Sequence, residues 1–399
     1  MEVVREPMHI DVVPNRGSRP AYLLRESFRD GGKVRKRTLA NLSTLADDQI
    51  DLFRRWIREG ATNDSPAEAP SADPADRTPT VYHAAPVVTA LAFSPDGRLL
   101  AVSGYREIFL HDLEANTSVR LPGLSQRIHS LLFTADGKTL LAAGGDPGRF
   151  GELQVWDVPG RTQRHSAIVT NDTVSGASLS PDGKTVAFGA TDKTIRIFDV
   201  ASGKEIRKME HHEDWVLATV FGVDGKRIVS VGRDRAAKLM NAETGAFVEN
   251  VNLLREPLTA LARHPKKDWV AIGGHERIPY LYRMDRPRAM RIADDSTLIR
   301  KFERQEGTIT ALAVSPSGQH LAVAAEDGEV RIYGLETGDP VARCSGHEGG
   351  IYALQFRPDG GILATGGFDG KVRLYDLAGK LVKEFIPVPL EKAAISQRQ

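Results

Sequence analysis

Two Gly-Lys-Thr triplets are the first residues whose types could do chemistry, because such a triplet ends the phosphate-binding loop of many nucleotide-binding proteins. The triplets begin at Gly137 and Gly183. A phosphate-binding loop also needs a glycine five residues before the triplet, and Leu132 and Ser178 stand there instead. Apolar runs flank both triplets, so we interpret them as hairpin turns.

Histidine, hydroxyl and carboxylate side chains occur near the carboxyl terminus, at His347, Thr365 and Asp369. Such groups are catalytic when a nucleophile lies beside a base. Cys344 is close by in the sequence, but a lone thiol with no base at a fixed spacing is more often structural than nucleophilic. No nucleophile, metal cluster or pair of acids stands at a recognisable spacing. We therefore predict that the protein is not an enzyme and has no catalytic residue, metal site or cofactor.

Composition excludes several further classes. Of the 399 residues, 41% are hydrophobic and 26% are charged, which is typical of a globular protein and unlike a disordered, collagenous or coiled-coil chain. Lys plus Arg (53) nearly balances Asp plus Glu (52), so no overall field draws the chain to nucleic acid or membrane. No apolar run spans a bilayer, and residues 1–14 lack the apolar segment of a signal peptide. We expect a cytoplasmic protein with no membrane partner.

A polar segment divides the chain. Residues 61–79, ATNDSPAEAPSADPADRTP, contain four prolines, four acids and hardly a large apolar side chain, so this segment cannot repay the entropy of ordering. We interpret it as a disordered linker. It separates a head, residues 1–60, from a body, residues 80–386, and residues 387–399 are predicted to be a flexible tail.

The body consists of internal repeats. Seven turn triplets follow one another, and the third residues of successive triplets are 40, 46, 42, 42, 51 and 42 residues apart. Each triplet lies between two apolar strands, and a third strand such as TIRIFD and a fourth such as KEIRKME complete the unit. Four antiparallel strands per unit build one blade of a propeller. Segments 80–84 and 380–386 could each pair at the edge of the last blade, so the way in which the ring closes stays open.

The repeats resemble the WD-repeat family. Trp156-Asp157 is the dipeptide that names the family, and Gly346-His347 matches its Gly-His signature. The predicted fold class is therefore all-β: a seven-bladed WD-repeat β-propeller over residues 80–386, preceded by a small α+β basic head and a disordered linker. Runs such as LAVSGYREIFLHDL also make the body similar to propeller segments of exported cytochrome-containing bacterial proteins, which implies that relatives are exported. The family pattern further implies a hydrogen-bonded chain inside a blade at His347, Thr365, Asp369 and Tyr375, and in the fourth blade at His212, Ser230 and Asp234.

The head has a different pattern. HIDVVP, AYLLRESFRD and VRKRTLANL predict three strands, and DDQIDLFRRWIREG predicts an amphipathic helix. Residues 1–60 resemble the amino-terminal segment of bacterial insertion-sequence transposases, on the stretch PNRGSRPAYLLRESFRDGGKVRKRTLANL. The catalytic domain of such enzymes would follow, but the linker and propeller occupy that place, so we predict no transposition chemistry.

A propeller implies a rigid platform for protein or peptide partners, with contacts on the loops that join one blade to the next. Trp215 is the preferred contact residue, because an exposed aromatic ring with a polar handle is typical of binding hot spots. Packing of this ring over the mouth of the central channel is the alternative. The predicted partner-binding residues are Arg127, Asp172, His212, Asp214, Trp215, Glu256, Glu306 and Glu348.

Three function hypotheses remain. The first is a monomeric, non-catalytic scaffold that binds protein or peptide partners on the loop face of the propeller. The second is a DNA-associated protein whose basic residues 16–37 contact phosphates nonspecifically. The third, ranked last, is an enzyme with a site in the channel. The DNA-binding candidates are Arg25, Arg29, Lys33, Arg35, Lys36 and Arg37.

Overall fold

The computed structural model describes residues 5–15, 19–30, 33–58, 78–284 and 295–391. The chain divides into two compact units, Met1–Ser71 and Ala72–Gln399. The predicted linker lies outside the described residues except for residues 78–79, and residues 392–399 of the predicted tail also lie outside them.

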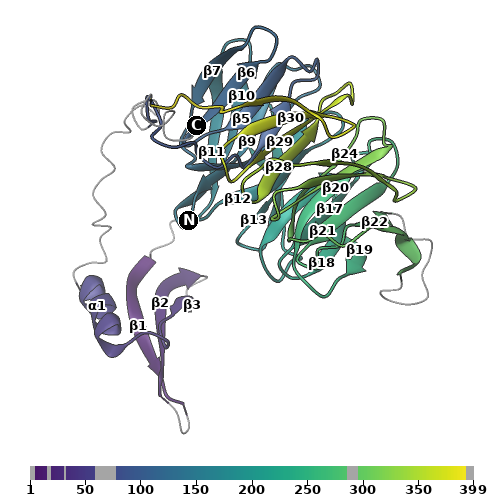
Figure 1. The fold of residues 1–399 in the computed structure, drawn as a ribbon. Coiled ribbons are helices and arrows are strands. Elements are labelled where there is room, and N and C mark those ends of the chain that lie inside the picture. Colours follow the sequence, from purple (N-terminus) through teal and green to yellow (C-terminus); the bar gives the residue numbers. More distant parts are fainter. Residues whose placement is uncertain (1–4, 16–18, 31–32, 59–77, 285–294, 392–399) are drawn as a thin grey trace. The chain divides into compact units, whose positions relative to one another are not determined.

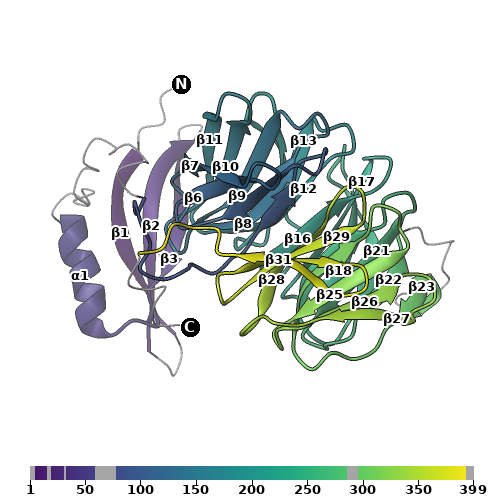
Figure 2. The same ribbon diagram turned by 45° about the horizontal axis from the view of Figure 1, so that its top comes forward.

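The first unit is the predicted α+β head. Strands β1 (Arg5–Val13), β2 (Ala21–Asp30) and β3 (Lys33–Asn41) form an antiparallel sheet in that order, and helix α1 (Asp47–Arg58) follows. Helix α1 runs along the sheet in Figure 2. Its apolar face closes the core of the head, because Ile50 is buried together with Leu24 and Leu42. The three strands and the helix predicted from the sequence are confirmed.

The second unit contains seven four-stranded antiparallel sheets within the described residues, each built from consecutive strands. Taken in chain order, the first blade is β4 (Leu91–Phe93), β5 (Leu99–Ser103), β6 (Glu107–Asp112) and β7 (Thr117–Pro122), the second is β8 (Arg127–Phe133), β9 (Thr139–Asp146), β10 (Phe150–Asp157) and β11 (Thr162–Thr170), and the third is β12 (Val174–Leu179), β13 (Thr185–Ala190), β14 (Ile195–Asp199) and β15 (Glu205–Met209). The fourth blade is β16 (Val216–Phe221), β17 (Arg227–Gly232), β18 (Ala236–Asn241) and β19 (Phe247–Leu253), and the fifth is β20 (Leu258–Arg263), β21 (Trp269–Gly274), β22 (Tyr280–Arg283) and β23 (Leu298–Lys301), with the short 3-10 helix η2 (Asp295–Thr297) before β23. The sixth blade is β24 (Ile309–Val314), β25 (His320–Ala325), β26 (Val330–Gly334) and β27 (Pro340–Cys344), and the seventh is β28 (Ile351–Phe356), β29 (Ile362–Gly367), β30 (Val372–Asp376) and β31 (Leu381–Phe385). The second strands are buried along nearly their whole length, because both of their faces pack against neighbouring blades.

The Asp-Gly triplets form the tight turns that the sequence predicted. In the first blade the Ser94 hydroxyl donates a hydrogen bond to Asp96 at 2.5 Å, and the Gly97 amide donates to the Ser94 carbonyl at 2.8 Å. Gly97 has a φ of 73°, a left-handed conformation that glycine adopts without steric cost. Gly137 and Gly183 have φ values of 68° and 70°, so both Gly-Lys-Thr triplets are turns of this kind and form no phosphate-binding loop.

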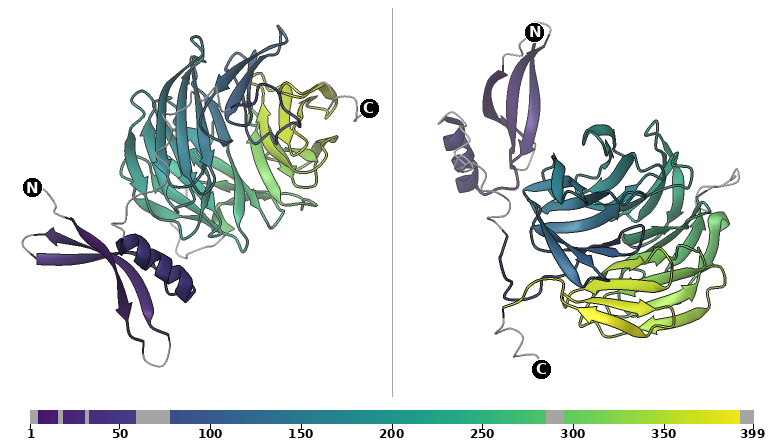
Figure 3. Two further views of the ribbon diagram at one scale, coloured as in Figure 1. Left: turned by 90° about the vertical axis from the view of Figure 1, so that its left-hand side faces the viewer. Right: turned by 90° about the horizontal axis from the view of Figure 1, so that it is seen from above.

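The blades close into a ring. The inner strands β4, β8, β12, β16, β20, β24 and β28 contact one another in order, and β28 contacts β4. Between the last and first blades, the Val88 amide donates to the Gly367 carbonyl at 3.0 Å and the Phe93 amide donates to Gln355 Oε1 at 2.6 Å. Figures 1 and 3 show the first blade of the propeller, in blue, beside the last blade, in yellow.

The two ends of the propeller pair with each other outside the first blade. The Tyr82 amide donates to the Pro389 carbonyl at 2.8 Å, and the Glu391 amide donates to the Tyr82 carbonyl at 3.0 Å. The Tyr82 ring packs against Phe109 of β6 and against Val388, which is buried. Residues 387–391 therefore belong to the folded propeller, which corrects the predicted tail boundary at residue 386. Segment 380–386 supplies the outer strand β31 of the last blade, whereas segment 80–84 does not pair with it.

Candidate interaction face

One face of the ring carries the loops in which partner-binding residues were predicted. It contains the loops that join each outer strand to the next inner strand and the loops that join the second and third strands of each blade; we call it the loop face. Backbone hydrogen bonds connect the two kinds of loop, for example from the Arg233 amide to the Trp215 carbonyl at 2.9 Å. The Asp-Gly turns lie on the opposite face, because successive strands of a blade are antiparallel.

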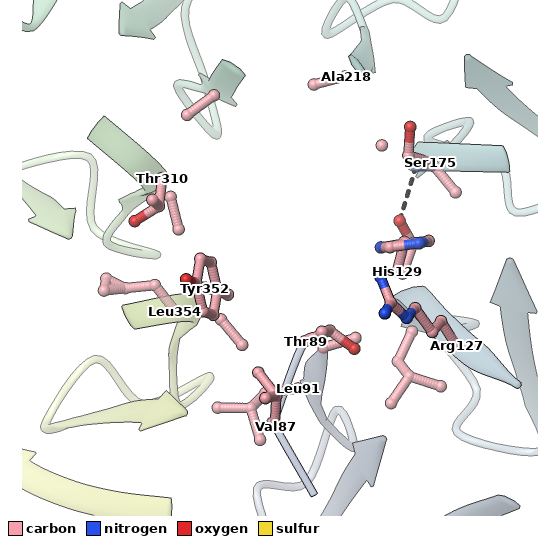
Figure 4. Close-up of a pocket in the computed structure, with 18 of the residues that line it drawn as sticks. Val87, Thr89, Leu91, Arg127, His129, Ser175, Ala218, Thr310, Tyr352 and Leu354 are labelled. Carbon is pink, nitrogen blue, oxygen red and sulfur yellow. Dashed lines mark hydrogen bonds between the residues drawn. The ribbon is translucent and has the colours of Figure 1, made fainter. Parts of the chain in front are cut away.

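A cavity of about 900 Å³ occupies the channel between the seven inner strands. Figure 4 shows the side chains that surround it. Four blades place a hydroxyl at one repeated position near the start of the inner strand, and each hydroxyl donates a hydrogen bond to a carbonyl of the next blade. In the first blade, Thr89 donates to the Ile128 carbonyl at 2.5 Å. The four hydroxyl residues are Thr89, Ser175, Thr259 and Thr310.

The other three blades break this pattern. His129, Leu217 and Tyr352 occupy the repeated position and all line the cavity. Figure 4 places His129 and Tyr352 on opposite sides of the channel, with Thr89 between them. Burial, together with the positive charge of Arg127, lowers the pKa of His129, so this imidazole is neutral at pH 7. It can therefore donate from one ring nitrogen and accept at the other.

Exposed aromatic side chains gather at the mouth of the same cavity. Tyr105, Tyr352 and Phe368 line it with exposed fractions of 38%, 39% and 60%. We call these three residues the aromatic rim. They come from the first and seventh blades, which are neighbours in the ring, and Gln126 donates a hydrogen bond to the Tyr105 hydroxyl at 3.3 Å. Large aromatic surfaces left in water next to a cavity are typical of binding sites.

The structure brings some of the predicted partner-binding residues together. Arg127 is exposed and lines the channel cavity. Trp215 and Asp172 line a second pocket of about 330 Å³, together with Asp192 and other residues of the third blade. Trp215 is 40% exposed, and the guanidinium carbon of Arg233 lies 4.6 Å from the centre of its ring. Trp215 is not among the residues that line the channel cavity.

The remaining predicted partner-binding residues do not gather. Glu256, Glu306 and Glu348 are exposed on three separate loops and line neither pocket. Asp214 is half-buried and accepts a hydrogen bond from the amide of the next residue. His212 is buried, with a side chain that is 0% exposed, so it cannot contact a partner as predicted.

Sequence reasoning missed the aromatic rim, although a signal was present. Tyr352 stands where Thr259 and Thr310 stand in other repeats, and Phe368 precedes Asp369 where other repeats have a polar residue, such as Glu326. Because other blades form with a threonine or a glutamate at these positions, an aromatic residue there is not needed for the blade, which points to a surface role.

Hydrogen-bonded networks inside the blades use the histidine and carboxylate residues that resembled catalytic groups. The two ring nitrogens of His347 lie 3.0 Å from Asp369 and 2.7 Å from the Thr365 hydroxyl. The Tyr375 hydroxyl does not extend this chain as expected, because it donates to the Ser345 carbonyl at 2.8 Å. Burial would raise the pKa of Asp369, but hydrogen bonds from His347 and Arg373 (2.7 Å) more than offset burial and hold that pKa well below its ordinary value. These groups are therefore internal ties of the seventh blade.

The fourth blade repeats the arrangement. The ring nitrogens of His212 lie 2.9 Å from Asp234 and 2.6 Å from the Ser230 hydroxyl. Four blades also join an aspartate to a cation four residues later; the ties of the fourth, sixth and seventh blades are mostly buried, whereas Asp192 of the third blade is exposed. The pairs are Asp192–Arg196, Asp234–Lys238, Asp327–Arg331 and Asp369–Arg373.

Other chemistry finds little support in the described part of the chain. Cys344 is buried. Its burial, and to a smaller extent the nearby charge of Asp376, raise the pKa of its thiol to about 12. Within the described ranges, no three His, Cys, Asp or Glu side chains come together to hold a metal ion. Among the same residues, no helix is long and apolar enough to cross a membrane.

The head pairs two of its predicted DNA-binding cations internally. Arg25 lies 2.9 Å and Lys36 lies 3.1 Å from the same Asp11 carboxylate oxygen. The hydrogen bond from Lys36 is the main cause that lowers the pKa of Asp11, so this carboxylate is ionised. The side chains of the other candidates, Arg29, Lys33, Arg35 and Arg37, lie outside the described residues.

Comparison with known families agrees with this geometry. The family described as WD domain, G-beta repeat, matches residues 78–112 and 338–376, in the first and the last two blades. The anaphase-promoting complex subunit 4 WD40 domain matches residues 148–222 and 261–351 between them. The body of the chain is a WD-repeat β-propeller. The IS1634 family transposase, N-terminal domain, matches residues 10–70, which agrees with the resemblance of the head.

Two fungal proteins are similar to the WD-repeat propeller. Nuclear distribution protein PAC1 of Coccidioides posadasii is 28% identical over 184 residues, which cover 43% of this chain and 39% of that protein. Eukaryotic translation initiation factor 3 subunit I of Aspergillus oryzae is 24% identical over 269 residues, which cover 60% of this chain and 76% of that protein. These relatives support a protein-interaction scaffold as the general class of function. A bacterial origin, a monomeric state and a cytoplasmic location stay predictions.

Proposed function

We propose that the propeller is a non-catalytic platform that binds a protein or peptide partner on its loop face, at the mouth of the central channel. The observation that carries this proposal is the aromatic rim, Tyr105, Tyr352 and Phe368, exposed around a cavity of about 900 Å³. Trp215, beside the second pocket, extends the same face and contributes a further contact.

The energetics favour this face over the outer surface of the blades. Aromatic residues dominate the binding energy of many interfaces, and truncation of a hot-spot aromatic residue costs about 2 kcal/mol or more. The channel walls are held by hydroxyl-to-carbonyl ties between blades, such as that from Thr310 to Ile351, so the site is rigid before a partner arrives. A rigid site loses little conformational entropy on binding.

Affinity capture tests the proposal. The full chain is used as bait beside a variant with Tyr105→Ala, Tyr352→Ala and Phe368→Ala, and beside a control with Phe247→Ala. Phe247 is a matched control because it is 44% exposed but lies on the outer strand β19. We expect a protein that is captured by the wild type and the control and is lost from the triple variant, with circular dichroism unchanged. Equal capture by all three baits contradicts the proposal.

DNA binding by the head is a second candidate function, favoured by the transposase-domain match over residues 10–70. Because Asp11 neutralises Arg25 and Lys36, the change Asp11→Asn releases two cations toward phosphate. If the sheet binds DNA, this variant should bind more tightly and with a steeper salt dependence in a gel-shift series. Asp51→Asn is the control, since Asp51 pairs with Arg54 on the helix. No retention of any variant at low salt would exclude this candidate, and nuclease treatment during affinity capture separates it from direct protein binding.

A further inference from the structure

The channel cavity has an unbalanced charge. Among the described residues that line it, Arg127 carries the single formal charge at pH 7, and no aspartate or glutamate is present. The other polar groups are hydroxyls, side-chain amides and the neutral imidazole of His129. The lining of the cavity thus places one positive charge beside neutral donors and acceptors.

Arg127 differs from propeller arginines that are held by an acidic side chain. Arg120 is held by Glu107 at 2.6 Å, and Arg373 is held by Asp369 at 2.7 Å. For Arg127, the described part of the chain provides no ion-pair or hydrogen-bond partner within reach of its guanidinium group, and the residue is exposed at the start of β8. Figure 4 shows Arg127 beside His129, across the channel from Tyr352. The guanidinium group thus retains its donors for a ligand.

We propose that the channel mouth binds a peptide segment in which an aspartate or glutamate lies next to a large apolar side chain. Arg127 holds the carboxylate, and the aromatic rim contacts the apolar side chain. The inference rests on the proposed function, and it adds the chemistry of the partner.

The charge of the site favours a carboxylate over a phosphate. One guanidinium balances one carboxylate in a bidentate pair, whose geometry matches the planar fork of arginine. A phosphate monoester carries a charge of about −1.5 to −2 at pH 7 and would leave charge uncompensated beside a neutral histidine. The exposed surface of the three aromatic rings is also much larger than a free carboxylate can cover, so an extended peptide fits better than a small organic acid.

Selection from a random-sequence peptide library displayed on mRNA tests this inference on the full chain. Three baits are compared: wild type, Arg127→Glu, and the control Arg255→Glu. Arg255 is exposed on the loop face but does not line the cavity. We expect the peptides selected by wild type and control to be enriched in aspartate or glutamate beside aromatic or aliphatic residues. We expect Arg127→Glu to select lysine or arginine at that place.

The affinity of one selected peptide then measures how much Arg127 contributes to binding. A charge-assisted hydrogen bond corresponds to at least about a tenfold change in Kd, so Arg127→Gln should weaken an acidic peptide by at least that factor. The same variant should leave its amide analogue, with Asn or Gln in place of the acid, almost unchanged. Peptides with no acidic enrichment, or with enrichment that survives Arg127→Glu, overturn the inference while the proposed function stands. Failure to select any peptide on the wild type overturns both. Peptides that bind equally well after loss of the aromatic rim also contradict both, because the rim is the proposed site and contacts the apolar side chain.

Discussion

Removal of the His347 side chain should destabilise the propeller through one identifiable network. His347→Ala deletes the contacts at 3.0 Å to Asp369 and at 2.7 Å to Thr365, all within a site where the histidine side chain is 2% exposed. A buried hydrogen bond between neutral groups contributes about 1 kcal/mol, and one to a charged group contributes about 1.5–3 kcal/mol. The sum is an upper bound, because part of the network survives.

The part that survives is the set of other donors to Asp369. Arg373 still donates to this carboxylate at 2.7 Å, and the Lys371 amide donates at 3.1 Å, so the charge is not left without partners. We therefore expect a loss of about 2–3 kcal/mol in the free energy of unfolding. The smaller change Thr365→Val removes one neutral hydrogen bond and should cost about 1 kcal/mol.

Denaturant unfolding followed by tryptophan fluorescence and by circular dichroism measures the loss. Glu348→Ala is the matched control, because Glu348 is the adjacent residue and is exposed, and a surface change of this kind should stay within about 0.5 kcal/mol of wild type. If His347→Ala unfolds at the same denaturant concentration as Glu348→Ala, the network is not an internal tie and our interpretation of these residues is wrong.

Three further predictions follow from other parts of the propeller. The folded pKa of Asp369 lies below its ordinary value of 3.8, so its ionised form stabilises the fold fully above about pH 5, and this contribution is lost progressively as the pH falls through 3.8 toward the folded pKa. The difference in melting temperature between wild type and Asp369→Asn should therefore shrink from pH 7 to pH 3, and a constant difference would contradict this. Tyr82→Ala should speed amide hydrogen exchange in residues 388–391 while the third to fifth blades are unchanged, since the Tyr82 ring packs against this segment. Unchanged exchange would show that the Tyr82 ring does not hold the terminal segment in place. Cys344 should resist iodoacetamide in the native protein at pH 8 and react only after denaturation, because it is buried and its pKa is about 12; labelling of the folded protein, read by mass spectrometry, would refute this.

The sequence was sufficient to predict the repeated features of the fold. The Asp-Gly turns, such as Asp96-Gly97, depend on local backbone conformation, and the alternation of apolar strands depends on burial, so both are visible at a fixed period of about 42 residues. The histidine networks were expected because two blades match the WD-repeat pattern that the resemblance implies. What recurs seven times is largely what each blade needs in order to fold.

Features that occur once were harder to predict. The pairing of Tyr82 with Leu390 joins residues that are far apart in the sequence and match no repeat, so it could not be derived from a period. The aromatic rim combines the first and seventh blades, which are neighbours only after the ring has closed. The prediction that His212 contacts a partner was wrong because its position on a loop suggested exposure, whereas its hydrogen bonds to Asp234 and Ser230, which the family pattern implied, draw it inward.

Site-specific photocrosslinking tests the central claim most directly. The full chain carries p-benzoylphenylalanine in place of Phe368 on the aromatic rim or, as the control, in place of Phe247 on β19, and is irradiated with the protein obtained by affinity capture. Our account predicts a covalent adduct from position 368 and none from position 247. An adduct from position 247 alone would place the partner on the outer surface of the blades and contradict a binding site at the channel mouth.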